Sequence, residues 1–359
     1  MKNKLHYLDG CRAIFCMVVF ISHFMMAFFP SVKPMFFNDG NLAVMYFLVL
    51  SGFVIPLKYV NDKPKKDKCK NSIKDIIRYA ILRYFRLLPV IFLSILVSWI
   101  ILRTGGYYTE EVSAKFNLEP IGNYFNQNVD FGNALFDATF GAFVRRPILN
   151  TPLWTIKYEF IGVIVTYIFF KSVATCKFRE YLYIVLIIVS YLISKDIYFV
   201  CIVSGTFLAD LMYNRHGDGS KLKKLYIRLE KKSLKWLALF VICIASGMIL
   251  INFHKEHFRF LWAFALIILM TYIPKLQKIM ETNFLVKLSK YTYMAYAIHW
   301  PIICSIACLF MLKFGEKCYN GMAIITFCVS IVILCLCTFL FRKYYEEPIQ
   351  EMIGGIIKK

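Results

Sequence analysis

The chain is dominated by apolar runs that are long enough to cross a lipid bilayer. Hydrophobic residues make up 59% of its 359 positions and charged residues only 18%, which is too little polar surface for a soluble protein of this length. We therefore predict an all-α, polytopic integral membrane protein with about ten transmembrane helices, each near the roughly 20 residues that span the hydrocarbon core. The predicted spans lie near residues 7–29, 41–57, 87–103, 152–170, 181–195, 197–213, 236–253, 260–273, 291–311 and 321–341.

Lysine and arginine residues collect in loops between these spans, above all at about 58–86 and 214–235. Because positively charged loops stay in the cytoplasm, we predict that the N- and C-termini are both cytoplasmic. The net charge of +21 then reflects membrane topology, and we expect membrane lipids rather than nucleic acid as its partners. The long loop at about 104–151 becomes external, and its polar and aromatic residues fit either a sugar-facing lid or a plain connection.

The spans are expected to form one transmembrane domain over residues 1–345, followed by a short cytoplasmic tail at 346–359. We expect no fused extracytoplasmic domain. The 12 cysteines lie mostly inside apolar runs and include no paired CxxC motif. They are therefore interpreted as buried thiols, and no metal site is expected.

The first span carries three polar residues, Asp9, Arg12 and His23. A charge at the bilayer centre costs about 2.5–3.5 kcal/mol even on the mildest scale, so these groups need partners or a function. Eleven residues separate Arg12 from His23, which places both on one helix face, roughly 16 Å apart along the axis. Asp9 shares that face and can pair with Arg12. A lined cavity and a satisfied structural network are both consistent with this stripe.

Glu159 in the fourth span is predicted to lie at the same depth as His23, since each is about seven residues from the external end of its helix. A carboxylate beside an imidazole is far cheaper to bury than one without a partner, and it can orient the imidazole for activating a hydroxyl. The alternative is that Glu159 pairs with Lys157 or Arg145 near the membrane surface.

Three further segments contain candidate residues. Arg83 and Arg86 lie on one face at the cytoplasmic end of the third span, where two guanidinium groups suit a phosphate-bearing ligand or simply flank the membrane. His299 is predicted near the depth of Arg12, and a structural role is as common as a functional one for such a histidine. Ser51 lies at mid-membrane beside a glycine, which usually indicates close helix packing.

Seven segments occur in this chain order: YLDGCRAIFCMVVFISHF, YFLVLSGFVI, RYFRLLPV, TPLWTIKYEFIG, SGTFLADL, LSKYTYMAYAIHWPI and YYEEPI. Together they resemble the bacterial acyltransferase 3 family, integral-membrane enzymes that acylate cell-surface glycans. Cys11 and Ile156 differ from the residues usual in that family, and the first motif has one histidine where many members have two. None of these differences removes a charged group of the predicted site.

The resemblance implies an O-acetyltransferase in the bacterial cytoplasmic membrane. Acetyl-CoA would be the cytoplasmic donor, and the acceptor would be a hydroxyl of a surface glycan such as O-antigen or of a lipid-linked saccharide. A His23–Glu159 pair would take the proton of the acceptor hydroxyl, and Arg12 could instead polarise the thioester. Direct transfer and a covalent acyl relay on His23, Ser51 or a tyrosine are both open.

The basic inner mouth of this expected site consists of Arg12, Arg83 and Arg86, which would hold the CoA phosphates, and we group His299 with them. Asp9, Ser51, Trp154 and Tyr293 are structural or minor candidates within the matching segments. A transporter or flippase for a polysaccharide or lipid-linked sugar is the alternative, because buried His, Arg and Glu residues also serve proton coupling. The Arg83/Arg86 pair favours the enzyme, since sugar export has no use for it.

Overall fold

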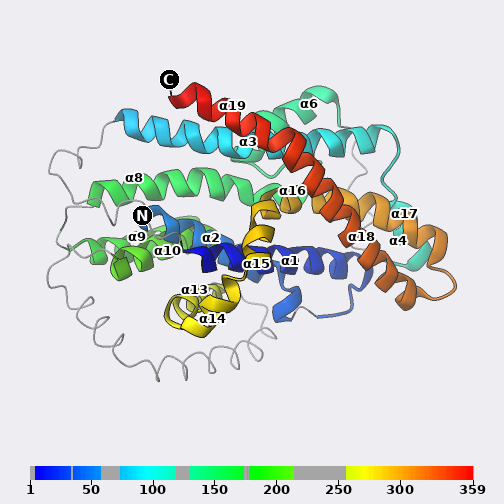
Figure 1. Cartoon of the computed structure of the whole chain (residues 1–359), viewed down its shortest axis with the longest axis horizontal. Helices are drawn as coiled ribbons and strands as arrows, with labels where there is room; N and C mark the ends of the chain where they lie inside the picture. The colour runs from blue at the N-terminus through cyan, green and yellow to red at the C-terminus, as the bar shows by residue number, and fades with distance from the viewer. Residues whose placement is uncertain are drawn as a thin grey trace. The chain divides into compact units, whose positions relative to one another are not determined.

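The structure is a computed structural model that describes residues 5–33, 35–57, 73–118, 129–173, 176, 178–213 and 256–358 (Figure 1). Within these ranges the chain forms helices and turns, with no strand. Six of the described helical segments are long and apolar enough to cross a membrane, and the bent pair α13–α14 could make a seventh. A helical membrane protein is therefore confirmed. The six segments are His6–Phe28, Gly40–Leu57, Ile73–Arg103, Thr151–Val173, Asn283–Phe314 and Tyr319–Gly355.

The predicted total of about ten spans and the cytoplasmic termini stay predictions. The span at 236–253, the loop at 214–235 and residues 58–72 lie outside the described residues. Two other predicted spans form helices shorter than a full crossing, α9 (Arg179–Ser194) and α10 (Ile197–Tyr213).

The third predicted span is part of a longer helix. The helix predicted at 87–103 is the second part of α3 (Ile73–Arg103), which contains 31 residues. Its first turns fall inside the predicted loop at 58–86, because lysine and arginine side chains there lower the hydropathy without interrupting the helix. Part of the long loop at 104–151 is also helical, in α4 (Thr109–Phe116), α6 (Phe131–Phe136), η3 (Asp137–Gly141) and α7 (Ala142–Val144).

The described residues group into two compact units, and the predicted single domain over 1–345 stays a prediction. Unit 1 comprises Met1–Phe15, Asn41–Ile81 and Tyr158–Val286, and unit 2 comprises Cys16–Gly40, Leu82–Lys157 and Lys287–Lys359.

In unit 1, α2 (Gly40–Leu57) lies in close contact with α10. A Cβ atom added at Gly52 would overlap the Ile202 carbonyl, and one added at Gly205 would overlap the Val49 carbonyl. The two backbones thus touch through one glycine from each helix, as small residues allow in membranes, and the close packing predicted around Ser51 is confirmed. Other described helical segments of this unit are the start of α1 (His6–Phe28), the start of α3, η5 (Tyr158–Gly162), α8 (Val163–Val173), α9, α13 (Glu256–Tyr272), α14 (Pro274–Met280) and most of α15 (Asn283–Leu288).

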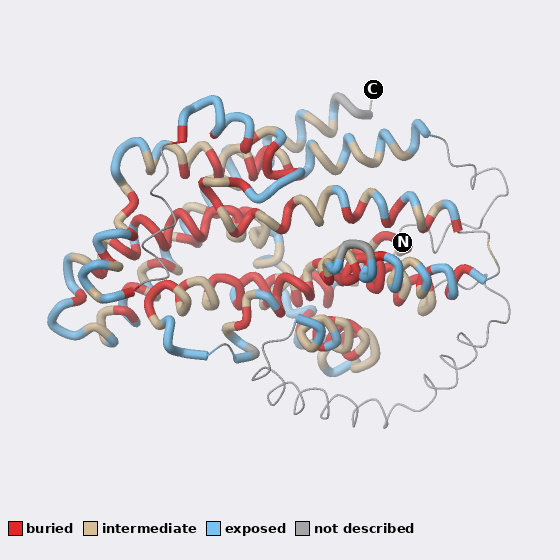
Figure 2. The backbone as a smooth tube through the Cα atoms, turned by 180° about the vertical axis from the view of Figure 1, so that it is seen from behind, coloured by how far each residue is buried: buried red, intermediate tan, exposed pale blue. Residues whose placement is uncertain are grey.

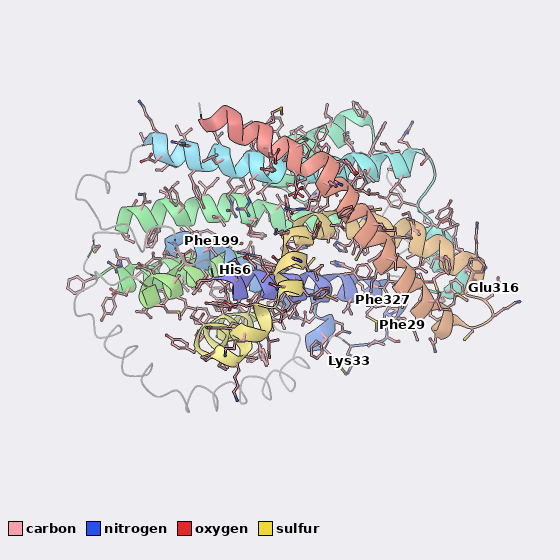
Figure 3. The ribbon with its side chains drawn as sticks, viewed as in Figure 1. His6, Phe29, Lys33, Phe199, Glu316 and Phe327 are labelled. Carbon is pink, nitrogen blue, oxygen red and sulfur yellow. The ribbon has the colours of Figure 1, made fainter. Side chains whose placement is uncertain are left out.

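Unit 2 places the remainder of α1 beside α18 (Tyr319–Phe341). Phe327, labelled in Figure 3, lies with its ring 5.6 Å from that of Phe20 and 5.1 Å from that of Phe24. The helix α16 (Thr292–Ile302) also packs on α18. Further elements of this unit are η1 (Phe36–Asn38), most of α3, α4, α6, η3, α7, η4 (Thr151–Thr155), η7 (Ser289–Tyr291), η8 (Ile303–Ala307), α17 (Cys308–Phe314), η9 (Arg342–Glu346) and α19 (Glu347–Lys358).

The C-terminal segment predicted as a tail is helical. In Figure 1 the ribbon runs from α18 through η9 into α19. Most of α19 is half-buried or exposed (Figure 2), yet the Gln350 side chain donates to backbone carbonyls of α3. The last turns therefore belong to unit 2.

Candidate active site

His23 and His299 come together in unit 2. Their rings lie 4.8 Å apart, and Nδ1 of His23 is 3.1 Å from Nε2 of His299. His23 lies on α1, and its Nδ1 is also 3.0 Å from the carbonyl oxygen of Val19, one turn earlier. The indole ring of Trp300 packs edge-on to His23 at 5.4 Å. Two imidazoles from segments far apart in the sequence therefore form one hydrogen-bonded pair.

His299 is held in α16 by a contact with its own helix. Its Nδ1 atom lies 2.6 Å from the carbonyl oxygen of Tyr296, and the side chain is nearly inaccessible, since the residue is 1% exposed. We expected this residue at the depth of Arg12. The structure places it beside His23, eleven residues further along α1. The prediction was wrong because the depth was counted from residue 291, whereas the helical segment that carries His299 begins at Asn283.

Pro301 explains the polar cluster around this part of α16. Proline has no N–H group, so the carbonyl of Ala297, four residues earlier, loses its helical hydrogen bond. The hydroxyl of Ser94 donates to that carbonyl at 2.6 Å, and the amide of Asn150 donates to it at 2.7 Å. Asn150 also donates to the Ser94 hydroxyl at 2.6 Å, and both side chains are fully buried. The kink predicted at Pro301 is accompanied by a π-helical turn, η8, directly after α16.

Two tyrosines fix the rest of α16. The Tyr296 hydroxyl is 2.7 Å from the hydroxyl of Thr155 and also donates to the Pro152 carbonyl. The Tyr293 hydroxyl donates to the Leu87 carbonyl of α3 at 3.0 Å. This hydrogen bond joins α16 to α3, and Tyr293 stays a minor candidate. Trp154 lies in the same short helix as Thr155 and is half-buried.

Ser51 and Glu159 form a second polar pair, in unit 1. The Ser51 hydroxyl donates to Oε2 of Glu159 at 2.7 Å. The next residue, Gly52, has a carbonyl that Pro56 deprives of its helical partner, and the Thr206 hydroxyl donates to it at 2.9 Å. Each pair therefore has one residue on a helix that contains a proline: Ser51 on the helix of Pro56, and His299 on the helix of Pro301.

The predicted pairing of His23 with Glu159 stays a prediction, because the two residues belong to different units. His23 contacts His299 in unit 2, and Glu159 contacts Ser51 in unit 1. Arg145, considered as an alternative partner of Glu159, forms an ion pair with Asp137 at 2.7 Å.

The predicted contact between Asp9 and Arg12 is confirmed. Nη1 of Arg12 lies 2.6 Å from Oδ1 of Asp9, one turn earlier on α1. Asp9 is buried, whereas 31% of the Arg12 side chain is exposed. The carboxylate offsets part of the charge of the guanidinium group, and about a third of the Arg12 side chain stays exposed.

Arg83 and Arg86 lie three residues apart in α3, half-buried and exposed respectively. Here Pro89 removes the helical partner of the Phe85 carbonyl. Gln350 of α19 donates to that carbonyl at 3.4 Å and to the Arg86 carbonyl at 2.9 Å. The C-terminal helix is therefore anchored at the turn that carries the arginine pair.

Sequence reasoning missed Ser94 and Asn150. A buried serine and asparagine in apolar surroundings require partners, and Pro301 creates an acceptor that needs donors. The sequence therefore indicates both the donors and the acceptor. Which donors meet which carbonyl depends on the tertiary fold.

Within the described residues, no group of three His, Cys, Asp or Glu side chains could hold a metal ion.

Comparison with known proteins gives the family. A family model described as an acyltransferase domain matches residues 5–342, which is nearly the whole chain. No curated protein and no solved structure matches the chain in the corresponding comparisons. The chain therefore belongs to the acyltransferase 3 family, and it is a membrane acyltransferase.

Proposed function

We propose that the protein transfers an acetyl group from acetyl-CoA to a hydroxyl of a surface glycan or lipid-linked saccharide, with His23 as the general base. The observation that carries the proposal is the pair of His23 and His299, 3.1 Å apart, in a membrane acyltransferase. An imidazole changes protonation state readily near neutral pH, which suits it to proton transfer.

The proposed step balances as a direct transfer. The acceptor oxygen forms a bond with the thioester carbonyl carbon while His23 takes the hydroxyl proton. The tetrahedral intermediate then collapses, the carbon–sulfur bond breaks, and the proton passes from His23 to the CoA thiolate. The products are an acetyl ester and CoA with a free thiol, and His23 returns to its starting state.

Arg83 and Arg86 are proposed to bind the phosphates of CoA, because guanidinium groups fork onto phosphate oxygens. Their spacing of three residues in α3 supports this role. Arg12, with 31% of its side chain exposed beside Asp9, is a further candidate for the donor. In the proposed topology, with about ten spans and both termini cytoplasmic, the donor approaches from the cytoplasm of a bacterial cell.

The first experiment measures transfer of radiolabelled acetyl groups from acetyl-CoA in proteoliposomes that contain extracted cell-envelope glycan. We expect His23→Ala to lose at least about 100-fold in kcat, in line with the usual contribution of a general base. The matched control is His257→Gln, since His257 is exposed and contacts Tyr191 instead. Full activity of His23→Ala, with the control also active, would remove His23 from the mechanism.

The second experiment tests the donor. CoA should raise the thermal unfolding temperature of the purified protein, since a ligand that binds the native state stabilises it. Arg83→Gln with Arg86→Gln should abolish that protection and raise the KM for acetyl-CoA, while Arg103→Gln, at the other end of α3, should do neither. Transport of sugar without any response to CoA would contradict the enzyme assignment.

Glu159 is kept as a proposed partner of His23. If it acts with His23, Glu159→Ala should abolish acetyl transfer while Ser51→Ala retains it. If the carboxylate only accepts the hydrogen bond of Ser51, both variants should lose stability by similar amounts and keep kcat.

A further inference from the structure

The histidine pair carries an inference that deepens the proposed function and rests on it. We propose that His299 is a positioning residue that fixes the tautomer of His23, so that Nε2 of His23 is the atom that takes the proton. The inference uses only hydrogen-bond chemistry, starting from the carbonyl oxygen of Tyr296.

The first step concerns His299. Its Nδ1 atom lies 2.6 Å from the Tyr296 carbonyl oxygen, and a carbonyl oxygen only accepts hydrogen bonds, so Nδ1 carries the hydrogen. Among the described residues, His299 contacts the backbone carbonyls of Tyr296 and Ala295 and the rings of His23 and Tyr296. With no carboxylate among these contacts, a buried imidazolium would lack compensation. His299 is therefore neutral, and its Nε2 atom is an acceptor.

The acceptor at Nε2 of His299 also determines which nitrogen of His23 carries a hydrogen. Nδ1 of His23 faces two atoms, Nε2 of His299 at 3.1 Å and the Val19 carbonyl oxygen at 3.0 Å. Both are acceptors, so Nδ1 of His23 must carry a hydrogen and share it between them. In a neutral imidazole the other nitrogen is then unprotonated. The lone pair of His23 Nε2 is thereby available as a base.

The arrangement also favours the protonated state of His23. When Nε2 takes a proton, the positive charge on the ring strengthens the hydrogen bonds that Nδ1 donates. His299 thus does for His23 what a carboxylate does in other enzymes: it selects the tautomer and orients the ring. The buried contacts of Ser94 and Asn150 with the Ala297 carbonyl hold the helix turn that carries His299.

The decisive measurement is the ¹⁵N NMR spectrum of the histidine rings in full-length protein labelled with ¹⁵N-histidine, with His23→Gln used to assign the signals. We expect His23 in the resting protein to show a protonated Nδ1 and an unprotonated Nε2. An unprotonated Nδ1 would overturn the proposal whatever the activity of any variant.

Two substitutions of His299 separate the acceptor from the shape of the ring. His299→Phe keeps the ring but has no acceptor, which leaves the Val19 carbonyl as the remaining acceptor for Nδ1 of His23. We expect the Nδ1–H tautomer of His23 to become less populated and kcat to fall about 10- to 100-fold, the range for partners that orient metal-bound histidines. The KM for acetyl-CoA should stay close to that of the unchanged protein. His299→Gln offers an amide oxygen near the position of Nε2 and should keep the Nδ1–H tautomer and most of the activity.

The outcomes distinguish this inference from the proposed function. If His23→Ala is fully active, the general base is wrong, although the tautomer can still be observed. If His23 is essential and His299→Phe keeps both the tautomer and kcat, His299 does not position His23. Should His299→Phe fail to fold, loss of the Nδ1–H tautomer in a folded His299→Gln protein would likewise overturn the inference.

Discussion

Two helix turns in unit 2 each contain a backbone carbonyl that a proline leaves without its helical hydrogen bond, and the two carbonyls find different replacement donors. In α16, Pro301 leaves the Ala297 carbonyl without a helical partner, and two fully buried side chains donate to it at 2.6 and 2.7 Å. In α3, Pro89 does the same to the Phe85 carbonyl, and one side chain, Gln350, approaches it at 3.4 Å on an exposed part of the helix.

The difference shows where the molecule requires rigidity. The α16 turn carries His299, whose ring must stay within hydrogen-bond distance of His23 for the proposed chemistry. The α3 turn carries Arg86, whose long side chain can reach a phosphate from several backbone positions. A third turn, where Pro56 exposes the Gly52 carbonyl to Thr206, lies between these extremes, since it has one donor that is fully buried.

The largest effect is expected at the α16 turn. Combining Ser94→Ala with Asn150→Leu leaves the Ala297 carbonyl buried without a donor, which should lower the free energy of unfolding by about 2–3 kcal/mol. Because the same turn carries His299, kcat should fall as well. Unfolding in mixed detergent micelles and acetyl transfer by the folded fraction measure the two effects.

Ser305→Ala is the matched control for this double variant. Ser305 is also buried, but its hydroxyl donates to the Pro301 carbonyl on its own helix. Ser305→Ala should lower the free energy of unfolding clearly less than the double variant does, and it should leave kcat unchanged. Equal losses in both proteins would mean that the donors at Ala297 have no special importance.

An intermediate effect is expected at the Pro56 turn. Thr206→Val keeps the shape of the side chain and removes the donor to Gly52, at a cost of about 1 kcal/mol, as measured for hydrogen bonds inside membrane proteins. Thr166→Val is the reference, since Thr166 is equally buried and donates to Gly162 on its own segment. A larger loss of stability in Thr166→Val than in Thr206→Val, measured by unfolding in detergent, would contradict a special role for the hydrogen bond to Gly52.

The smallest effect is expected at the Pro89 turn. Gln350→Ala removes a half-exposed donor whose carbonyl acceptors can turn to water, so the free energy of unfolding should change by less than about 0.5 kcal/mol. Glu351→Ala, on an exposed neighbour, gives the baseline. A loss as large as that of the α16 double variant would show that α19 stabilises unit 2 far more than its exposure suggests.

Much of this architecture could be predicted from the sequence, because hydropathy reports directly on helices that must bury every backbone polar group. The Asp9–Arg12 contact was predictable for a similar reason, since residues three apart on a helix are neighbours. Both inferences depend on local geometry alone.

The contact between His23 and His299 could not be predicted in the same way. Matching depths by counting residues requires the correct start of each span, and the segment counted from residue 291 begins at Asn283. The donors of Ala297 come from α3 and from a segment just before η4, so only the tertiary fold brings them together. A proline inside an apolar run is the local signal that a distant polar residue will be needed nearby.

The contact of α2 with α10 has a consequence for motion. Since the backbones meet at Gly52 and Gly205, neither helix can slide or rotate past the other without steric collision. The two must shift as one body, and Ser51 travels with both. If the acceptor is the glycan proposed above, a rearrangement that admits it has to come from segments outside this pair. Even an alanine at either glycine would force the helices apart.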